Sequence, residues 1–121
     1  MNTLVIAILS ITLSVAAQFS LKAGMSSVVV QEILSQPFTK RTAFTVLSDK
    51  FVLGGFLLYG LGAIVWLGVL SKWDVSKAYP LVGLGFVFTV AISLMAGEHV
   101  TLPRAIGVVL ISAGVFLVGR S

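Results

Sequence analysis

Four long apolar segments dominate the pattern of hydrophobic and polar positions along this chain of 121 residues. They cover residues 3–24, 51–71, 78–97 and 102–119, and most charged residues fall between them. Each is close to the length of about 20 apolar residues that crosses the hydrocarbon of a bilayer. Because backbone groups in lipid must pair within their own segment, each span is expected to be an α-helix. The pattern predicts an all-α integral membrane protein, with four transmembrane helices in a single transmembrane domain of residues 1–121.

The first segment has a second interpretation as a cleaved signal peptide, since VAAQ near position 16 resembles a cleavage site. No Lys or Arg precedes the apolar run, however, and cleavage would leave three helices. We therefore expect a membrane span.

Three connections join these segments, and they differ in length. The first, residues 25–50, mixes the apolar runs VVV and AFTVL with charged residues, so part of it is expected to lie in the membrane interface. The second, SKWDVSK, is short, which predicts that the second and third spans are antiparallel neighbours. The third, GEHVTLP, is equally tight. Lys and Arg residues divide three to five between the two sides of the membrane, which weakly favours a cytoplasmic first and third connection.

Composition agrees with a membrane protein and excludes several other classes. Hydrophobic residues make up 58% of the chain and charged residues 10%, whereas soluble domains carry about 25% charged residues. The formal charge of +4 is spread over short loops, so no basic face for nucleic acid is expected. The chain has no cysteine and a single histidine, so we expect no metal site and no cofactor. No Walker loop or nucleophile–base pair is present, and an enzyme is not expected.

One line of polar residues runs through the first apolar segment. Ser10, Ser14, Gln18 and Lys22 are four residues apart, so on a helix they lie nearly above one another. Polar side chains within a membrane usually face the bundle interior and often mark a substrate path. The serines alone are more typical of helix packing. Lys22 fits two roles equally well, snorkelling to the headgroups or contacting an anion.

Aromatic residues offer a second set of candidates. Tyr59 and Trp66 are seven residues apart in the second span and therefore share one face. A packing stripe and a cavity wall are both consistent with this spacing. Tyr79 begins the third span with Lys77 beside it, a pattern that an interfacial tyrosine with a flanking lysine also explains.

The acidic residues all lie in connections or at helix ends. They are Glu32, Asp49, Asp74 and Glu98. A proton-coupled exporter of organic cations needs a membrane-embedded acid that exchanges protons for the charge of the cation. The charge within or near the spans is instead positive, which suits an anionic substrate.

Glycines punctuate the second, third and fourth spans, as expected where helices pack closely in lipid. Four helices enclose little space for a substrate. A transport function therefore predicts a dimer, with the substrate site at the junction of the repeats.

Three stretches carry a resemblance to a known family. The tail GEHVTLPRAIGVVLISAGVFLVG resembles the closing signature of EamA-type members of the drug/metabolite transporter superfamily, which include the four-helix small multidrug resistance proteins. The stretches SVAAQFSLKAG and GLGAIVWLGVLSKWDVSKAYPLVGLGFVF are more similar to the small subunits that flip aminoarabinose-phosphoundecaprenol. The similarity covers most of the chain apart from the first connection, which is longer here.

The resemblance implies roles for individual positions. In the drug exporters an essential glutamate lies eight residues before the lysine that closes the first helix, and Ser14 occupies that place here. Gln18 and Lys22 correspond to the Gln and Lys in the first helix of the lipid-sugar subunits. Trp66 and Tyr79 match the Trp and the Ala-Tyr-Pro tyrosine of the same group.

Together these patterns predict a flippase subunit for an anionic polyprenyl-phosphate-linked sugar lipid in a bacterial inner membrane. We expect it to pair with itself or with a related four-helix subunit. The expected substrate-binding residues divide by role: Lys22 for the phosphate, Gln18 and Ser14 for the polar path, Trp66, Tyr59 and Tyr79 for the groove, and Lys77 and Arg104 for headgroup capture. A small multidrug resistance-type exporter of cationic or polyamine-like compounds and a non-transporting membrane scaffold are the alternatives.

Overall fold

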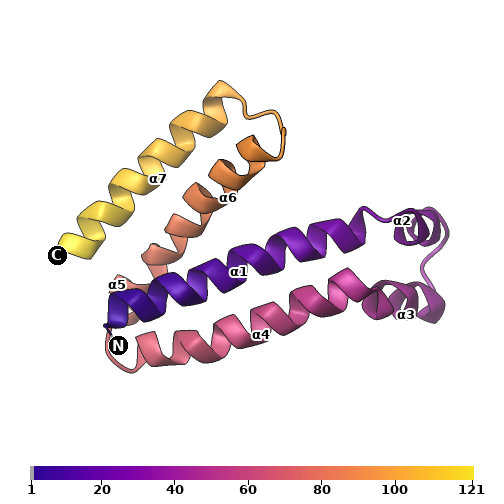
Figure 1. Ribbon diagram of the computed structural model, residues 1–121, viewed down its shortest axis with the longest axis horizontal. Helices are drawn as coiled ribbons and strands as arrows, with labels where there is room; N and C mark the ends of the chain where they lie inside the picture. The colour runs from indigo at the N-terminus through magenta and orange to yellow at the C-terminus, as the bar shows by residue number, and fades with distance from the viewer. Residues whose placement is uncertain (1) are drawn as a thin grey trace.

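The computed structural model describes residues 2–121, and every regular element within them is a helix (Figure 1). Four helical stretches are long and apolar enough to cross a membrane, so the prediction of an all-α membrane protein with four spans is confirmed. The elements in chain order are α1 (Thr3–Met25), α2 (Val28–Leu34), α3 (Lys40–Ser48), α4 (Lys50–Leu70), α5 (Val75–Ala78), η1 (Tyr79–Gly83), α6 (Leu84–Met95) and α7 (Leu102–Arg120).

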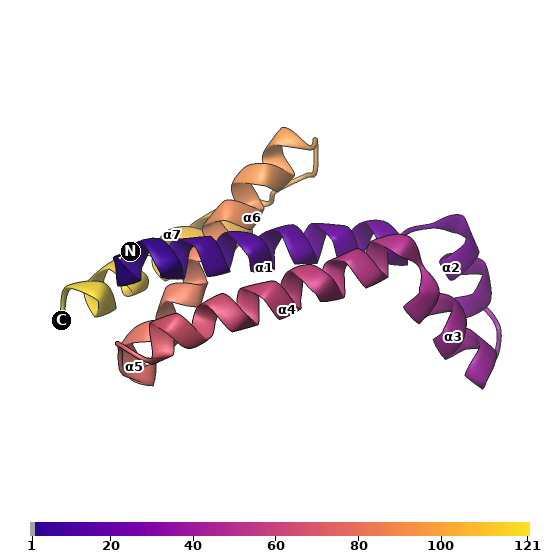
Figure 2. The same cartoon turned by 60° about the horizontal axis from the view of Figure 1, so that its bottom comes forward.

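The third span is not one continuous α-helix. It begins as α5, tightens into the 3₁₀ segment η1, and continues as α6. Pro80 lies at the start of η1, and its missing N–H and its ring both oppose an uninterrupted α-helix. The interruption redirects the chain, so that α6 crosses α1 at an angle (Figures 1 and 2).

Small residues allow α1 and α4 to pack along most of their lengths. A Cβ atom on Gly55 would lie 2.6 Å from the Leu21 side chain and 3.2 Å from the Ala17 carbonyl oxygen. A Cβ atom on Gly62 would lie 3.3 Å from the Ser10 carbonyl oxygen. The close backbone approach at these positions is the packing that small residues provide in lipid.

The expectation that the second and third spans are neighbours does not hold along their lengths. Helix α4 packs along α1, whereas α6, which follows the connection, packs against α1 and α7. Val115 of α7 fixes this course because a Cβ atom on Gly83 would lie 2.9 Å from its side chain. Helices α4 and α6 therefore make little contact with each other.

The first connection is largely helical. It folds into α2 and α3, which are in contact and each contain one buried residue, Val30 and Thr42. Figure 2 shows both helices turned across the direction of α1 and α4. We call residues 28–48 the α2–α3 hairpin.

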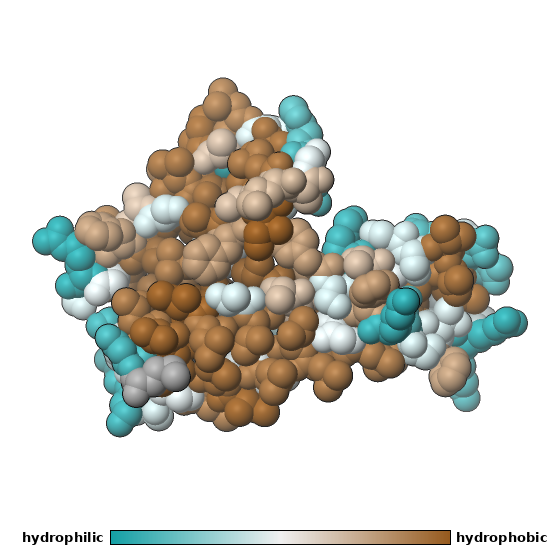
Figure 3. All heavy atoms as spheres, viewed as in Figure 1, coloured by the Kyte–Doolittle hydropathy of each residue, from teal (hydrophilic) through white to brown (hydrophobic). Residues whose placement is uncertain are grey.

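Apolar side chains cover the outside of the spans, while hydrophilic ones gather at their ends and on the α2–α3 hairpin (Figure 3). Large exposed apolar residues occur on all four spans. Exposing such an apolar surface to water costs free energy, whereas contact with hydrocarbon does not. The chain is a multi-pass membrane protein.

Candidate functional site

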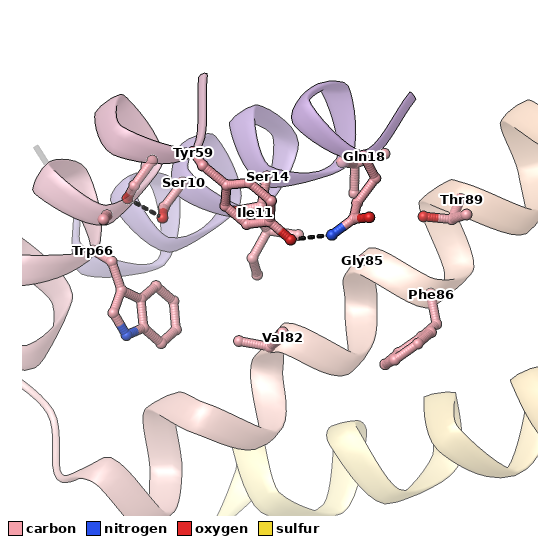
Figure 4. Close-up of a pocket in the computed structure, with 13 residues that line it drawn as sticks. Ser10, Ile11, Ser14, Gln18, Tyr59, Trp66, Val82, Gly85, Phe86 and Thr89 are labelled. Carbon is pink, nitrogen blue, oxygen red and sulfur yellow. Dashed lines mark hydrogen bonds between the residues drawn. The ribbon is translucent and has the colours of Figure 1, made fainter. Parts of the chain in front are cut away.

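A cavity of about 550 Å³ lies between α1, α4 and the η1–α6 segment (Figure 4). It exists because α4 and α6 diverge while both contact α1. Its walls are formed by Ser10, Ile11, Ser14, Val15, Gln18, Tyr59, Gly62, Ala63, Trp66, Val82, Gly85, Phe86 and Thr89.

The wall from α1 carries three members of the polar line, one helical turn apart. Ser10 is buried and donates its hydroxyl to the carbonyl oxygen of Gly62 at 2.7 Å, so it joins α1 to α4. Ser14 is half-buried and also lies beside Gly62. Gln18 is exposed at the open end of the line. The sequence spacing correctly placed these side chains on one face.

Gln18 and Tyr59 meet on the side of the cavity that α1 and α4 form. The amide Nε2 of Gln18 donates a hydrogen bond to the hydroxyl of Tyr59, which links α1 to α4 (Figure 4). Both residues are exposed in this chain, so a bound molecule can reach the amide and the phenol.

Several other polar groups of the cavity remain free to bind a ligand. Figure 4 marks two hydrogen bonds among the lining residues, Ser10 to Gly62 and Gln18 to Tyr59. Neither bond uses the Ser14 hydroxyl, the Trp66 indole N–H or the Thr89 hydroxyl. Because a polar group costs free energy when left unpaired away from water, these three groups favour a ligand that carries its own donors and acceptors.

The cavity lining is uncharged. All four acidic side chains of the chain lie elsewhere, and the nearest cation along the polar line is Lys22. Lys22 is exposed, one helical turn beyond Gln18, which on an α-helix is a rise of about 6 Å. The site therefore has a neutral, hydrogen-bonding interior and a positive charge beyond one end.

Four of the eight expected site residues line the cavity: Ser14, Gln18, Tyr59 and Trp66. The lining does not include Lys22, Lys77, Tyr79 or Arg104. Lys77 places its ammonium over the Trp73 ring, 4.7 Å from the ring centre. Tyr79 is 68% exposed, and Arg104 donates to the carbonyl oxygen of His99 at 3.4 Å on the α6–α7 connection. The structure does not bring these three residues to the cavity.

Sequence reasoning did not identify the wall from the third span, which includes Val82, Phe86 and Thr89. A signal was present for Thr89, whose hydroxyl lies in the middle of the apolar run LGFVFTVAI. Phe86 has no such signal, because its position on the cavity depends on how α6 crosses α1.

The chain is similar to bacterial proteins that are named as flippase subunits. The chain is 43% identical over 67 residues to a protein of Erwinia tasmaniensis named "Probable 4-amino-4-deoxy-L-arabinose-phosphoundecaprenol flippase subunit ArnE", in a match covering 54% of the chain and 62% of that protein. It is 42% identical over 66 residues to the subunit of the same name from Pseudomonas aeruginosa (strain UCBPP-PA14), covering 54% of the chain and 57% of that protein. These matches span little more than half the length of either relative.

A longer match comes from Proteus mirabilis. The corresponding ArnF subunit is 30% identical over 118 residues, which cover 94% of the chain and 89% of that protein. The chain belongs to the family of aminoarabinose-phosphoundecaprenol flippase subunits. No family model matches the chain, and no solved structure matches it.

Family membership confirms the resemblance that the first helix and the Ala-Tyr-Pro segment indicated. Where the resemblance to drug exporters puts an essential acid, Ser14 supplies a hydroxyl.

Proposed function

We propose that this chain is one subunit of a flippase that moves a polyprenyl-phosphate-linked sugar across a bacterial inner membrane. The observation that carries the proposal is the uncharged cavity with free hydrogen-bonding groups, next to an exposed lysine on the same helix face. The names of its relatives, which describe flippase subunits for such a lipid, support the same conclusion. This activity is transport rather than catalysis.

The sugar headgroup is the part of the lipid that suits the cavity. A sugar ring carries hydroxyl groups that pair with Ser14, Gln18 and Thr89, and apolar C–H faces that pack on the ring of Trp66. Its volume is well below the 550 Å³ available, so the cavity also has room for part of the phosphate linkage.

The phosphate group is the part that suits Lys22. An ammonium near a phosphate forms a charge-assisted hydrogen bond, which is stronger than a neutral one. Ser14 and Gln18 then offer hydrogen bonds at successive turns of α1 as the headgroup moves inward. The polar line is in this proposal a path for the phosphate.

The polyprenyl chain remains in the bilayer throughout. Tyr59 and Ala63 on α4 and Phe86 on α6 line the cavity and are also exposed on the outside of the chain. The cavity is therefore open sideways, between α4 and α6, and an apolar tail can extend through this side into lipid while the headgroup is bound.

The same open side is the reason to propose a second subunit. Helix α7 packs mainly on the η1–α6 segment and contributes no residue to the cavity lining, so one chain surrounds the cavity with α1, α4 and the η1–α6 segment. A second copy or a related four-helix subunit would close the remaining side and exclude water from the headgroup. The relatives' names describe subunits, which agrees with such a pairing.

Export of small cations is the weaker proposal. A cation in an uncharged cavity has only aromatic faces and hydroxyl groups to replace its hydration, and the lining contains no carboxylate to hold it or to exchange protons. A scaffold function does not explain why free donors line a cavity.

Lys22→Ala tests the proposal in sealed vesicles that contain the purified chain, with its sibling subunit if one is needed, and a short-chain polyprenyl-phosphate sugar. Loss of a charge-assisted contact is expected to lower the flipping rate roughly ten- to hundredfold, and Lys22→Arg is expected to keep part of the activity.

The matched control is Lys72→Ala, which removes an exposed lysine at the opposite end of the spans. It is expected to flip the lipid at the unmodified rate. A correctly inserted Lys22→Ala protein that also flips at that rate would remove Lys22 from the site.

A further inference from the structure

The α2–α3 hairpin presents exposed apolar side chains outside the four spans. Phe38 is 79% exposed, Phe44 74% and Leu47 53%. Phe44 and Leu47 are three residues apart on α3, so they project from one side of this helix. Several large exposed apolar side chains close together in one short segment mark a candidate site of contact with a membrane or a protein.

Cationic side chains flank these apolar residues. Lys40 begins α3, one turn before Phe44 and on the same side of the helix, and Arg41 follows it. Lys50 lies just beyond the end of α3. Residues 22–50 contain two acids, Glu32 and Asp49. The Asp49 carboxylate is already hydrogen-bonded, because its Oδ1 accepts from the backbone N–H groups of Phe51 at 2.9 Å and Val52 at 3.2 Å.

The hairpin is held at a fixed angle to the spans. Only Ser26 and Ser27 separate α1 from α2, and only Asp49 separates α3 from α4. The Gln31 amide donates to the Met25 carbonyl oxygen at 2.6 Å, and Asp49 caps the first turn of α4. These short links keep both helices turned across the span direction, as Figure 2 shows.

We propose that the α2–α3 hairpin lies in the membrane interface and binds anionic phospholipids, with the side chains of Phe38, Phe44 and Leu47 among the acyl chains. Its orientation across the spans turns α3 away from the bilayer normal. An apolar helix side bordered by Lys and Arg is the pattern of interfacial helices, whose apolar side enters the headgroup–acyl boundary by about 5–10 Å. Lys40, Arg41 and Lys50 then lie at the level of the lipid phosphates.

This inference concerns bulk phospholipid rather than the transported lipid, so it stands independently of the proposed function. The hairpin would enrich anionic lipid headgroups next to Lys22, at the end of α1 to which it is joined.

The absence of cysteine in the chain allows a direct test by site-specific labelling. The cysteine of a Phe44→Cys variant is labelled with the environment-sensitive fluorophore NBD. The labelled full chain is then reconstituted in vesicles of phosphatidylcholine with or without phosphatidylglycerol. The expected result is blue-shifted emission that is quenched by lipids brominated on the acyl chain. Glu98→Cys, in an exposed connection at the same end of the spans, is the control and is expected to emit as in water.

Lipid selectivity is tested on the same labelled protein. Brominated phosphatidylglycerol is expected to quench the probe at position 44 more strongly than brominated phosphatidylcholine does. The double variant Lys40→Gln/Arg41→Gln is expected to abolish this preference, whereas Lys72→Gln at the opposite end leaves it intact.

Two results would overturn the proposal. One is water-like, unquenched emission at position 44, as expected if the hairpin extends into solution or docks on a protein instead. The other is an anionic-lipid preference that survives the double variant.

Discussion

Ser10 and Ser14 lie one turn apart on α1, yet their hydroxyl groups have different surroundings. Ser10 donates to the backbone of α4, whereas Ser14 faces the cavity. The four-residue spacing predicts that both share a face with Gln18, and it correctly predicts the direction of that face. It does not predict which hydroxyl is engaged, because this depends on the close approach that Gly62 allows.

Gln18→Leu is expected to slow flipping of the sugar lipid. The substitution keeps the approximate size of the side chain and removes an amide that contacts the cavity and Tyr59. Loss of one neutral hydrogen bond to the headgroup corresponds to a roughly two- to tenfold lower rate in the vesicle assay.

Thr12→Val provides the control on the same helix. The Thr12 hydroxyl bonds the carbonyl oxygen of Ile8 at 2.8 Å and does not line the cavity, so its loss is expected to leave the rate unchanged. Equal effects of the two substitutions would mean that Gln18 contributes only to helix packing.

At the scale of the elements, glycine distribution separates packed faces of α4 from lipid-facing ones. Gly55 and Gly62 contact α1, while a Cβ atom on Gly60 would meet nothing within 4 Å. The sequence predicts close packing from the number of glycines in this span. It cannot predict which of them form the interface, since the second span is apolar on every side.

Gly55→Leu is expected to destabilise the bundle because a Cβ atom at this position already overlaps Leu21 and approaches the Ala17 carbonyl oxygen. Overpacking of this kind costs about 1–3 kcal/mol. The measurement is thermal unfolding of the detergent-solubilised protein. Gly60→Leu introduces the same side chain into open space and is expected to leave the unfolding temperature nearly unchanged; a similar loss in both variants would contradict the proposed α1–α4 interface.

The third span shows where element-level prediction stops. Its position and helical character follow from the apolar run, and the proline after Tyr79 marks the place where it changes direction. Its partner does not follow from the short connection, because η1 turns α6 toward α1 and α7. This change of partner separates α4 from α6 and creates the cavity. Prediction of the third wall therefore required the tertiary arrangement.

At the scale of the whole molecule, the cavity is lined by α1, α4 and the η1–α6 segment, and its lining residues Tyr59 and Phe86 are exposed on α4 and α6. The arrangement suits a lipid substrate, since its headgroup and its tail need different surroundings at the same time. Closure of the open side by a second subunit would separate the headgroup from the bilayer. If the chain pairs as proposed, the partner would cover this open side.

Binding of the sugar headgroup in the cavity is tested most directly through the fluorescence of Trp66. The chain has two tryptophans, so Trp73→Phe leaves Trp66 as a single reporter on the cavity wall. Titration of this reconstituted variant with a short-chain polyprenyl-phosphate sugar is expected to give a saturable change in emission. Polyprenyl phosphate without the sugar is expected to give a much smaller change. Unchanged Trp66 emission in vesicles that still flip the glycolipid would show that the headgroup crosses the membrane outside this cavity.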